Sequence, residues 1–125
     1  MPFVSITVVQ PKTETFTQQL SALVHAAMID TINCPPASLY HRISQVDRNS
    51  LMYLPEYKGL HRSDDVIIFQ ITLKEGRTPE MKQAMYERIT TDLRREMSIR
   101  PEDVIIVLTE NKAEDWFFGR EATDS

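Results

Sequence analysis

Proline stands directly after the initiator methionine, at the start of the β-branched segment MPFVSITVV. Proline lacks a backbone N–H and weakens a strand, although the first strand position tolerates it. Because proline is small enough to permit removal of the preceding methionine, the processed chain is expected to begin with the secondary amine of Pro2. An unprotonated amine accepts protons, so Pro2 is a candidate general base. Taken alone, a proline here is more often a chance occurrence.

The other potentially reactive side chains are few and form no recognisable ligand set. Cys34 is the single cysteine, so it has no internal disulfide partner, which fits a reducing compartment. The three histidines, His25, His41 and His61, lack the i, i+4 spacing of paired ligands, and we predict no metal site and no cofactor.

Charge and hydropathy exclude several classes of partner. The formal net charge of -4 and the sequence pI near 5.3 argue against a nucleic-acid surface or a polybasic membrane patch. The chain has no apolar run of membrane-spanning length and no signal-peptide pattern at its start. We therefore expect a cytoplasmic protein that binds neither nucleic acid nor membrane.

An internal repeat organises the chain, whose 125 residues, 42% of them hydrophobic, are enough for one domain with an ordinary core. A shift of about 65 residues aligns its two halves without a gap. The identical pairs are Ile6 with Ile71, Thr7 with Thr72, Thr13 with Thr78, Gln18 with Gln83, and Pro36 with Pro101. We assign the whole chain, 1–125, to a single domain with units at about 2–46 and 66–110 and a tail at 111–125.

Each unit is predicted to form a strand, a helix and a strand. In the second unit Thr78 suits the N-cap, Pro79 suits the first helical position, and the helix is expected to run to about Met97. In the first unit the helix is expected from about Thr15 to Ile32. An apolar stripe at four-residue spacing predicts the buried side of the second helix: Met81, Met85, Ile89, Leu93 and Met97.

Two such units predict an α/β (α+β) fold, a four-stranded mixed sheet with both helices on one face. Strands joined by a crossover helix are parallel and right-handed in nearly all cases. The opposite face is left uncovered, and we expect it to carry Val4, Ile6 and Val8 of the first strand. Apolar residues of this kind require cover, so we predict oligomerisation through the sheets.

Several segments together resemble the tautomerase superfamily, in particular its longer-chain branch similar to malonate semialdehyde decarboxylase. They are the MP start, the duplicated βαβ units, GRT before the second helix, and DVIIVLTEN followed by EDWFFGR. The resemblance spans nearly the whole chain, and Pro2 and DWFFG are its most specific parts. It implies a tautomerase-like homotrimer with active sites at subunit boundaries, an enzyme that needs no cofactor.

The resemblance also implies a role for individual residues. Pro2 matches the catalytic amino-terminal proline, and Arg77 matches the arginine that binds a substrate carboxylate. Trp116 and Phe118 match aromatic residues near the active site, although packing between subunits is an alternative role for them. This chain departs from the decarboxylase pattern at two positions. It has Ser38 where the decarboxylase has an aspartate, and Glu75 where the decarboxylase has a second arginine. Lys74, adjacent to Glu75, offers a point charge without the bidentate fork of arginine.

These residues supply the minimum that proton transfer on an enol or a 2-oxo acid requires. A free α-amino group has a reference pKa of about 8, and a neighbouring guanidinium disfavours its protonated form. One base and one cation for the carboxylate are enough for this isomerisation. The leading hypothesis is therefore a tautomerase acting on small carboxylates. Two alternatives are a decarboxylase of a short 3-oxo acid and a non-catalytic ligand-binding trimer, because a fold does not fix function.

Overall fold

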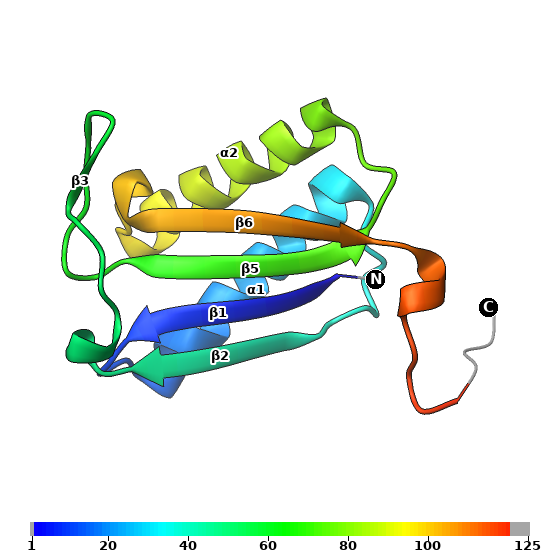
Figure 1. Cartoon of the computed structure of the whole chain (residues 1–125), viewed down its shortest axis with the longest axis horizontal. Helices are drawn as coiled ribbons and strands as arrows, with labels where there is room; N and C mark the ends of the chain where they lie inside the picture. Colours follow the sequence, from blue (N-terminus) through cyan, green and yellow to red (C-terminus); the bar gives the residue numbers. More distant parts are fainter. Residues whose placement is uncertain (1, 121–125) are drawn as a thin grey trace.

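The computed structural model describes residues 2–120 and has the predicted architecture (Figure 1). Four strands form one mixed sheet in the order β2-β1-β5-β6, in which β1 pairs antiparallel with β5 and the two outer pairs are parallel. Both helices cover the same side of this sheet. The main elements are β1 (Phe3–Val9), α1 (Glu14–Ile32), β2 (His41–Val46), β5 (Ile67–Lys74), α2 (Pro79–Met97) and β6 (Val104–Asn111).

The repeat is visible in the way both helices begin and end. The side chains of Thr13 and Thr78 each accept a hydrogen bond of 3.1 Å from the backbone N–H three positions later, as N-caps do. Both helices contain 19 residues and end at a residue in the left-handed conformation, Asn33 (φ 58°) and Ser98 (φ 55°). The two caps at each end lie 65 residues apart in sequence, which is the spacing of the predicted repeat.

The core lies between the sheet and the two helices. Val4, Ile6 and Val8 have no exposed surface and belong to this core. Their prediction for the open face was wrong: alternation separates the two sides of a strand, and the more apolar side of β1 is the one that packs under the helices. The predicted stripe of α2 is confirmed, with Met85, Ile89 and Leu93 buried and its two end residues partly buried.

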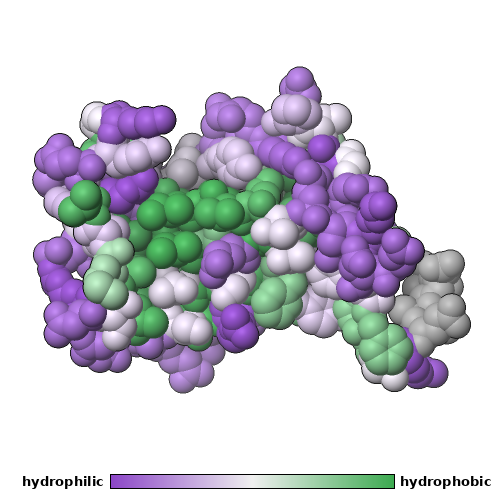
Figure 2. Space-filling model, viewed as in Figure 1, coloured by the Kyte–Doolittle hydropathy of each residue, from purple (hydrophilic) through white to green (hydrophobic). Residues whose placement is uncertain are grey.

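The open face of the sheet mixes apolar and small polar side chains. The strand register assigns it Ser5, Thr7, Gln70, Thr72 and Thr109 as well as the apolar Phe3, Ile68, Ile105 and Val107. Phe3 is 37% exposed and Val107 50% exposed. Figure 2 shows the resulting hydrophobic surface over the middle of the sheet.

A cluster of arginine and aspartate side chains, which includes a buried carboxylate, links the two helices. Asp92 is 3% exposed and accepts hydrogen bonds from Arg88 (2.6 Å) and Arg95 (2.9 Å) on its own helix. Arg88 also pairs with Asp30 of α1 at 2.8 Å. Hydrogen bonding to both carboxylates raises the pKa of Arg88, so this guanidinium stays charged. Asp92 is thus a fully paired charge inside the helix interface.

The connection between the units contains a small hairpin, β3 (Glu56–Tyr57) and β4 (Leu60–His61), that we did not predict. Its two-residue turn has positive φ at Lys58 (46°) and Gly59 (85°), as a type I′ turn requires. Beyond it, Ser63 donates its N–H and its hydroxyl to Asp103, at 2.7 Å each, and so joins the connection to the start of β6. Within residues 2–120, no helix is long and apolar enough to cross a membrane.

Candidate active site

Pro2 is buried at the beginning of β1, at the end of the sheet where β5 and β6 finish. The register of β1 and β5 pairs Phe3 with Thr72, so Pro2 lies beside the last residues of β5. On the other side, the Val4 N–H donates to the carbonyl of Tyr40, just before β2, at 2.9 Å. Pro2 therefore lies at the end of the sheet where β1 and β2 begin and where β5 and β6 end (Figure 1).

Arg77 belongs to the turn between β5 and α2 and is half-buried. Its Nε donates to the Ile32 carbonyl at 3.0 Å and its Nη1 to the Lys74 carbonyl at 3.2 Å. Ile32 ends α1, so the guanidinium satisfies a carbonyl that the helix leaves unpaired and lies at the negative end of the helix dipole. Within residues 2–120 these bonds use only Nε and Nη1, which leaves the Nη2 side of the planar fork available to an anion.

Lys74 is exposed and differs from Arg77 in its orientation. Lys74 pairs with Asn111 at the ends of β5 and β6, and the alternation of β5 assigns its side chain to the open face. The bonds of Arg77, in contrast, lead to the end of a helix on the covered face. The structure brings both cations to the same end of the sheet but from its two sides.

Ser38 and Cys34 lie beneath this region. Ser38 is 5% exposed, and its N–H donates to the Pro35 carbonyl at 2.9 Å. Cys34 is 2% exposed, and its thiol lies 3.5 Å from the Ser38 carbonyl. Burial raises the pKa of the Cys34 thiol, while the positive charge of Arg77 acts in the opposite direction. The proximity of Arg77 to Cys34 was not predicted, because it depends on contact between the end of α1 and the turn after β5.

The aromatic tail extends from the end of β6 toward the start of β2. The Trp116 indole N–H donates to the Asn111 side-chain oxygen at 2.7 Å. The rings of Trp116 and Phe118 are stacked with centroids 6.0 Å apart, and Phe118 lies 5.7 Å from the ring of Tyr40. Tyr40 and Asn111 were missed from the sequence, since each looks like an ordinary strand-end residue until its distant partner is known.

The arrangement brings a cation, aromatic rings and the proline at the start of β1 to one end of the sheet. Arg77 approaches from the covered side of the sheet, the aromatic rings from strand ends on the open side, and Pro2 begins the strand between them. Among residues 2–120, no three histidine, cysteine or acidic side chains lie close enough to hold a metal ion. The residues present can bind a carboxylate and, through an amine, move a proton.

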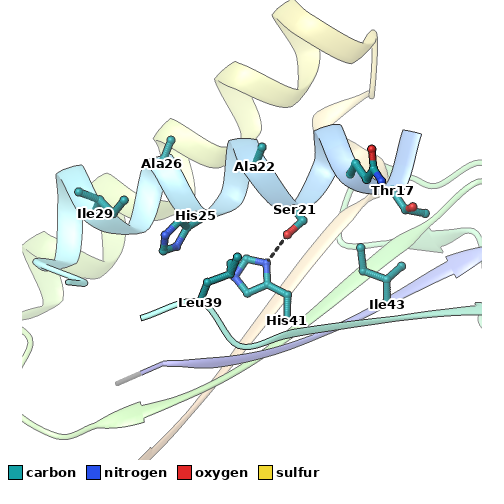
Figure 3. Close-up of a pocket in the computed structure, with 10 residues that line it drawn as sticks. Thr17, Ser21, Ala22, His25, Ala26, Ile29, Leu39, His41 and Ile43 are labelled. Carbon is teal, nitrogen blue, oxygen red and sulfur yellow. Dashed lines mark hydrogen bonds between the residues drawn. The ribbon is translucent and has the colours of Figure 1, made fainter. Parts of the chain in front are cut away.

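A hollow between α1 and β2 is poorly suited to a carboxylate (Figure 3). This groove has a volume of about 500 Å³ and is lined by apolar residues such as Ile29, Leu39 and Ile43. At its floor Ser21 and His41 are hydrogen bonded at 2.8 Å. Burial, with a smaller effect of the neighbouring His25, lowers the pKa of His41 to about 4. His41 is therefore neutral at pH 7, and no lysine or arginine lines the groove to hold a carboxylate.

Comparison with known proteins finds similarity over most of the chain. A family described as "Tautomerase enzyme" matches residues 38–119 of this chain. The "Probable tautomerase YusQ" of Bacillus subtilis (strain 168) is 39% identical over 119 residues, which cover 95% of this chain and 94% of that protein.

Two solved structures of malonate semialdehyde decarboxylases share the fold. One has 28% sequence identity and a TM-score of 0.88, covers 96% of this chain and 92% of the other, and is described in terms of decarboxylase and hydratase activities. The second, inhibited by 3-bromopropiolate, has 25% identity and the same TM-score of 0.88, and the alignment covers 96% of this chain and 91% of the other. The match extends over both repeat units and most of the tail.

Proposed function

The chain belongs to the tautomerase superfamily and is by homology a tautomerase, an isomerase, and from this premise we propose that it moves a proton on small enol or 2-oxo carboxylates. The observation that carries the proposal is the position of Pro2, buried at the strand start beside the end of β5, from which Arg77 follows. After removal of Met1, the nitrogen of Pro2 is the base. Arg77 holds the carboxylate of the substrate.

The reaction needs one proton and no other reagent. The nitrogen of Pro2 takes the enol O–H proton, the electron pair of the O–H bond forms the carbonyl π bond, and the π electrons of the carbon–carbon double bond move onto the neighbouring carbon. The same proton is then delivered to carbon, which regenerates the free amine. Arg77 stabilises the carboxylate and the negative charge that develops on the conjugated oxygen.

Ultraviolet absorbance tests this function directly, because an enol acid loses its conjugation on conversion to the oxo acid. We expect the unmodified protein to accelerate the loss of absorbance of enol carboxylates and Pro2→Ala to slow it, since a primary amine differs from proline in basicity and geometry. Intact mass must first confirm that Met1 is absent from both proteins. Failure to convert any enol acid, with the free amine confirmed, would favour a non-catalytic binding protein instead.

A decarboxylase of a short 3-oxo acid is the second candidate, favoured by the structural match to the two malonate semialdehyde decarboxylases. Ser38 separates the two reactions. A serine is no carboxylate base, so a tautomerase that needs only Pro2 and a cation should tolerate Ser38→Ala, apart from a modest cost in packing. We expect enol substrates to be turned over by Ser38→Ala and little malonate semialdehyde to be consumed by the unmodified protein. Efficient decarboxylation that collapses in Ser38→Ala would reverse this order.

We also propose that the chain assembles as a homotrimer through the open face of its sheet. The support is the hydrophobic surface formed by Phe3, Ile68, Ile105 and Val107, which a single chain leaves in contact with water (Figure 2). Closed cyclic symmetry covers such a face in every copy at once. Light scattering that shows a stable monomer at micromolar concentration would contradict this assembly.

A further inference from the structure

The repeat gives the sheet a second end that is built like the one at Pro2. Strands β1 and β5 run antiparallel, so β5 begins at the end of the sheet where β1 finishes, opposite to Pro2 (Figure 1). The spacing between the two units assigns Ile67 to the place of Pro2 and Lys12 to the place of Arg77. We name this opposite region the Lys12 end.

Lys12 repeats a hydrogen bond that Arg77 makes. The Lys12 ammonium donates to the Val9 carbonyl at 2.6 Å, and the Arg77 guanidinium donates to the carbonyl of Lys74, which is the equivalent position in the other unit. Both cations therefore lie between the end of a strand and the start of the helix that follows it. The Lys12 side chain is only 15% exposed.

A pocket lies beside Lys12. Its volume is about 260 Å³, and its apolar lining consists of Phe16, Ile67, Met97 and Ile99. The end of α2 borders this pocket as the end of α1 borders Arg77, so elements related by the repeat form both regions. A small, largely apolar hollow with a few charged groups is typical of a site for a small molecule.

The chain itself supplies a carboxylate to Lys12. Asp65 accepts a hydrogen bond from Lys12 at 2.8 Å, and the Asp65 side chain is 67% exposed. The other carboxylate of the lining, Asp103, is buried, accepts two hydrogen bonds from Ser63 and lies 3.6 Å from Arg100. Asp65 is therefore the carboxylate that can be displaced, because an exposed ion pair adds little to stability. Its departure leaves two cations and one carboxylate in the lining, which favours an anion.

We propose that the pocket at the Lys12 end is a second site for small monocarboxylates, which binds them without turnover, and that Asp65 takes the place of their carboxylate when no ligand is bound. The ligand carboxylate replaces Asp65 on Lys12, and a short alkyl chain packs against the apolar lining. The nitrogen of Ile67 is a backbone amide, so the position equivalent to Pro2 offers no amine base. The inference rests on the proposed function for one point, the role of Arg77 as a carboxylate-binding cation.

Amide NMR spectra follow both ends of the sheet in one titration. Butanoate and butanamide are matched probes, because they have the same number of non-hydrogen atoms and differ in charge. We expect butanoate to shift the amide signals of Ser63 and Ile99 saturably and butanamide to leave them in place. Binding at Arg77 is read separately, from the amide signals of Cys34 and Thr78.

Three variants test whether Lys12 and Asp65 control this binding. Lys12→Met removes the cation and should raise the Kd of butanoate at the Lys12 end by about tenfold or more, the usual effect of losing a charge-assisted hydrogen bond. Asp65→Asn removes the competing carboxylate and should lower the same Kd by about two- to fivefold. Lys82→Met, which breaks an ion pair with Glu110 at 2.9 Å, is the matched control and should leave this Kd unchanged.

The outcomes separate this site from the catalytic one. Absent shifts at the Lys12 end, equal shifts with butanoate and butanamide, or a Kd that Lys12→Met does not change would overturn the inference. None of these results affects the proposed function, because the loss of enol absorbance reports on catalysis alone. Failure of the unmodified protein to convert any enol acid would overturn the proposed function, and the shifts of Ser63 and Ile99 would still decide whether the second site exists.

Discussion

Replacement of Arg77 by alanine tests both roles that the structure gives to this residue. The variant loses the bond from Nε to the Ile32 carbonyl at the end of α1 and the bond from Nη1 to the Lys74 carbonyl. It also loses the cation proposed to bind the carboxylate. The change is therefore expected to lower both the free energy of unfolding and the rate of catalysis.

The two losses differ in size. The bond to Ile32 is partly buried and the bond to Lys74 is exposed, so we expect a total loss of about 1–2 kcal/mol in stability. A charge-assisted bond to substrate is worth roughly 1.5–3 kcal/mol, which corresponds to a fall of about ten- to a hundredfold in kcat/KM. Arg77→Lys should recover only part of this activity, because an ammonium restores the charge without the planar fork.

Thr78→Ala provides a control of similar stability. Thr78 is the residue directly after Arg77, and its replacement removes the N-cap hydrogen bond that its hydroxyl accepts from the Met81 N–H at 3.1 Å. We expect this loss to cost about 1 kcal/mol in stability. Denaturant unfolding should show comparable losses for Thr78→Ala and Arg77→Ala, whereas the ultraviolet assay, run well below the unfolding midpoint, should show a large loss for Arg77→Ala alone. Equal kcat/KM in these two variants would refute the role of Arg77 in substrate binding and leave it the role of a helix cap.

Three further predictions concern stability and assembly. The unfolded chain protonates His41 near its ordinary pKa of 6.5 and the folded chain only near 4, so the free energy of unfolding should fall by about 2–3 kcal/mol as the pH falls through this window. His41→Gln should flatten this fall in thermal unfolding curves, and an unchanged pH dependence in the variant would contradict the assignment to His41. Asp92→Ala should cost about 1.5–3 kcal/mol in denaturant unfolding because it removes charge-assisted hydrogen bonds from two arginines to a buried carboxylate. Asp30→Ala, at an exposed pair, should cost less than about 1 kcal/mol, and equal costs would contradict a larger role for the buried carboxylate. Val107→Asp should shift light scattering toward the monomer, and an unchanged mass would exclude this part of the open face from the interface.

The sequence was sufficient for features that depend on neighbouring residues. Thr78 and Pro79 mark the start of α2 because N-capping acts within one turn, and the four-residue stripe marks its buried side because helical periodicity is local. The repeat carried the same reasoning over to α1. The face of β1 was predicted wrongly because a strand pattern shows that two sides exist without showing which of them the helices cover.

Features that depend on distant partners were not predictable. Asn111 and Tyr40 acquire their roles from Trp116 and Phe118, and the tail's path past the strand ends is not encoded in any local period. The bond between Arg77 and Ile32 joins residues 45 positions apart, so the sequence suggested the cation but not its second task at the end of α1. The sequence therefore predicted the roles of residues that act within one helical turn. It predicted the roles of residues that meet only in the tertiary fold where the family resemblance pointed to them.

The central claim, that the amine of Pro2 is the base, is tested most directly by blocking that amine without replacing the residue. An alanine inserted between Met1 and Pro2 leaves a processed chain in which the nitrogen of Pro2 is an amide, and intact mass verifies the new terminus. We expect kcat/KM for an enol carboxylate to fall by about a hundredfold or more relative to the chain with free Pro2, the usual contribution of a general base, with the unfolding midpoint unchanged. Activity within about twofold of the unmodified protein would contradict the claim, because an amide nitrogen cannot accept the proton.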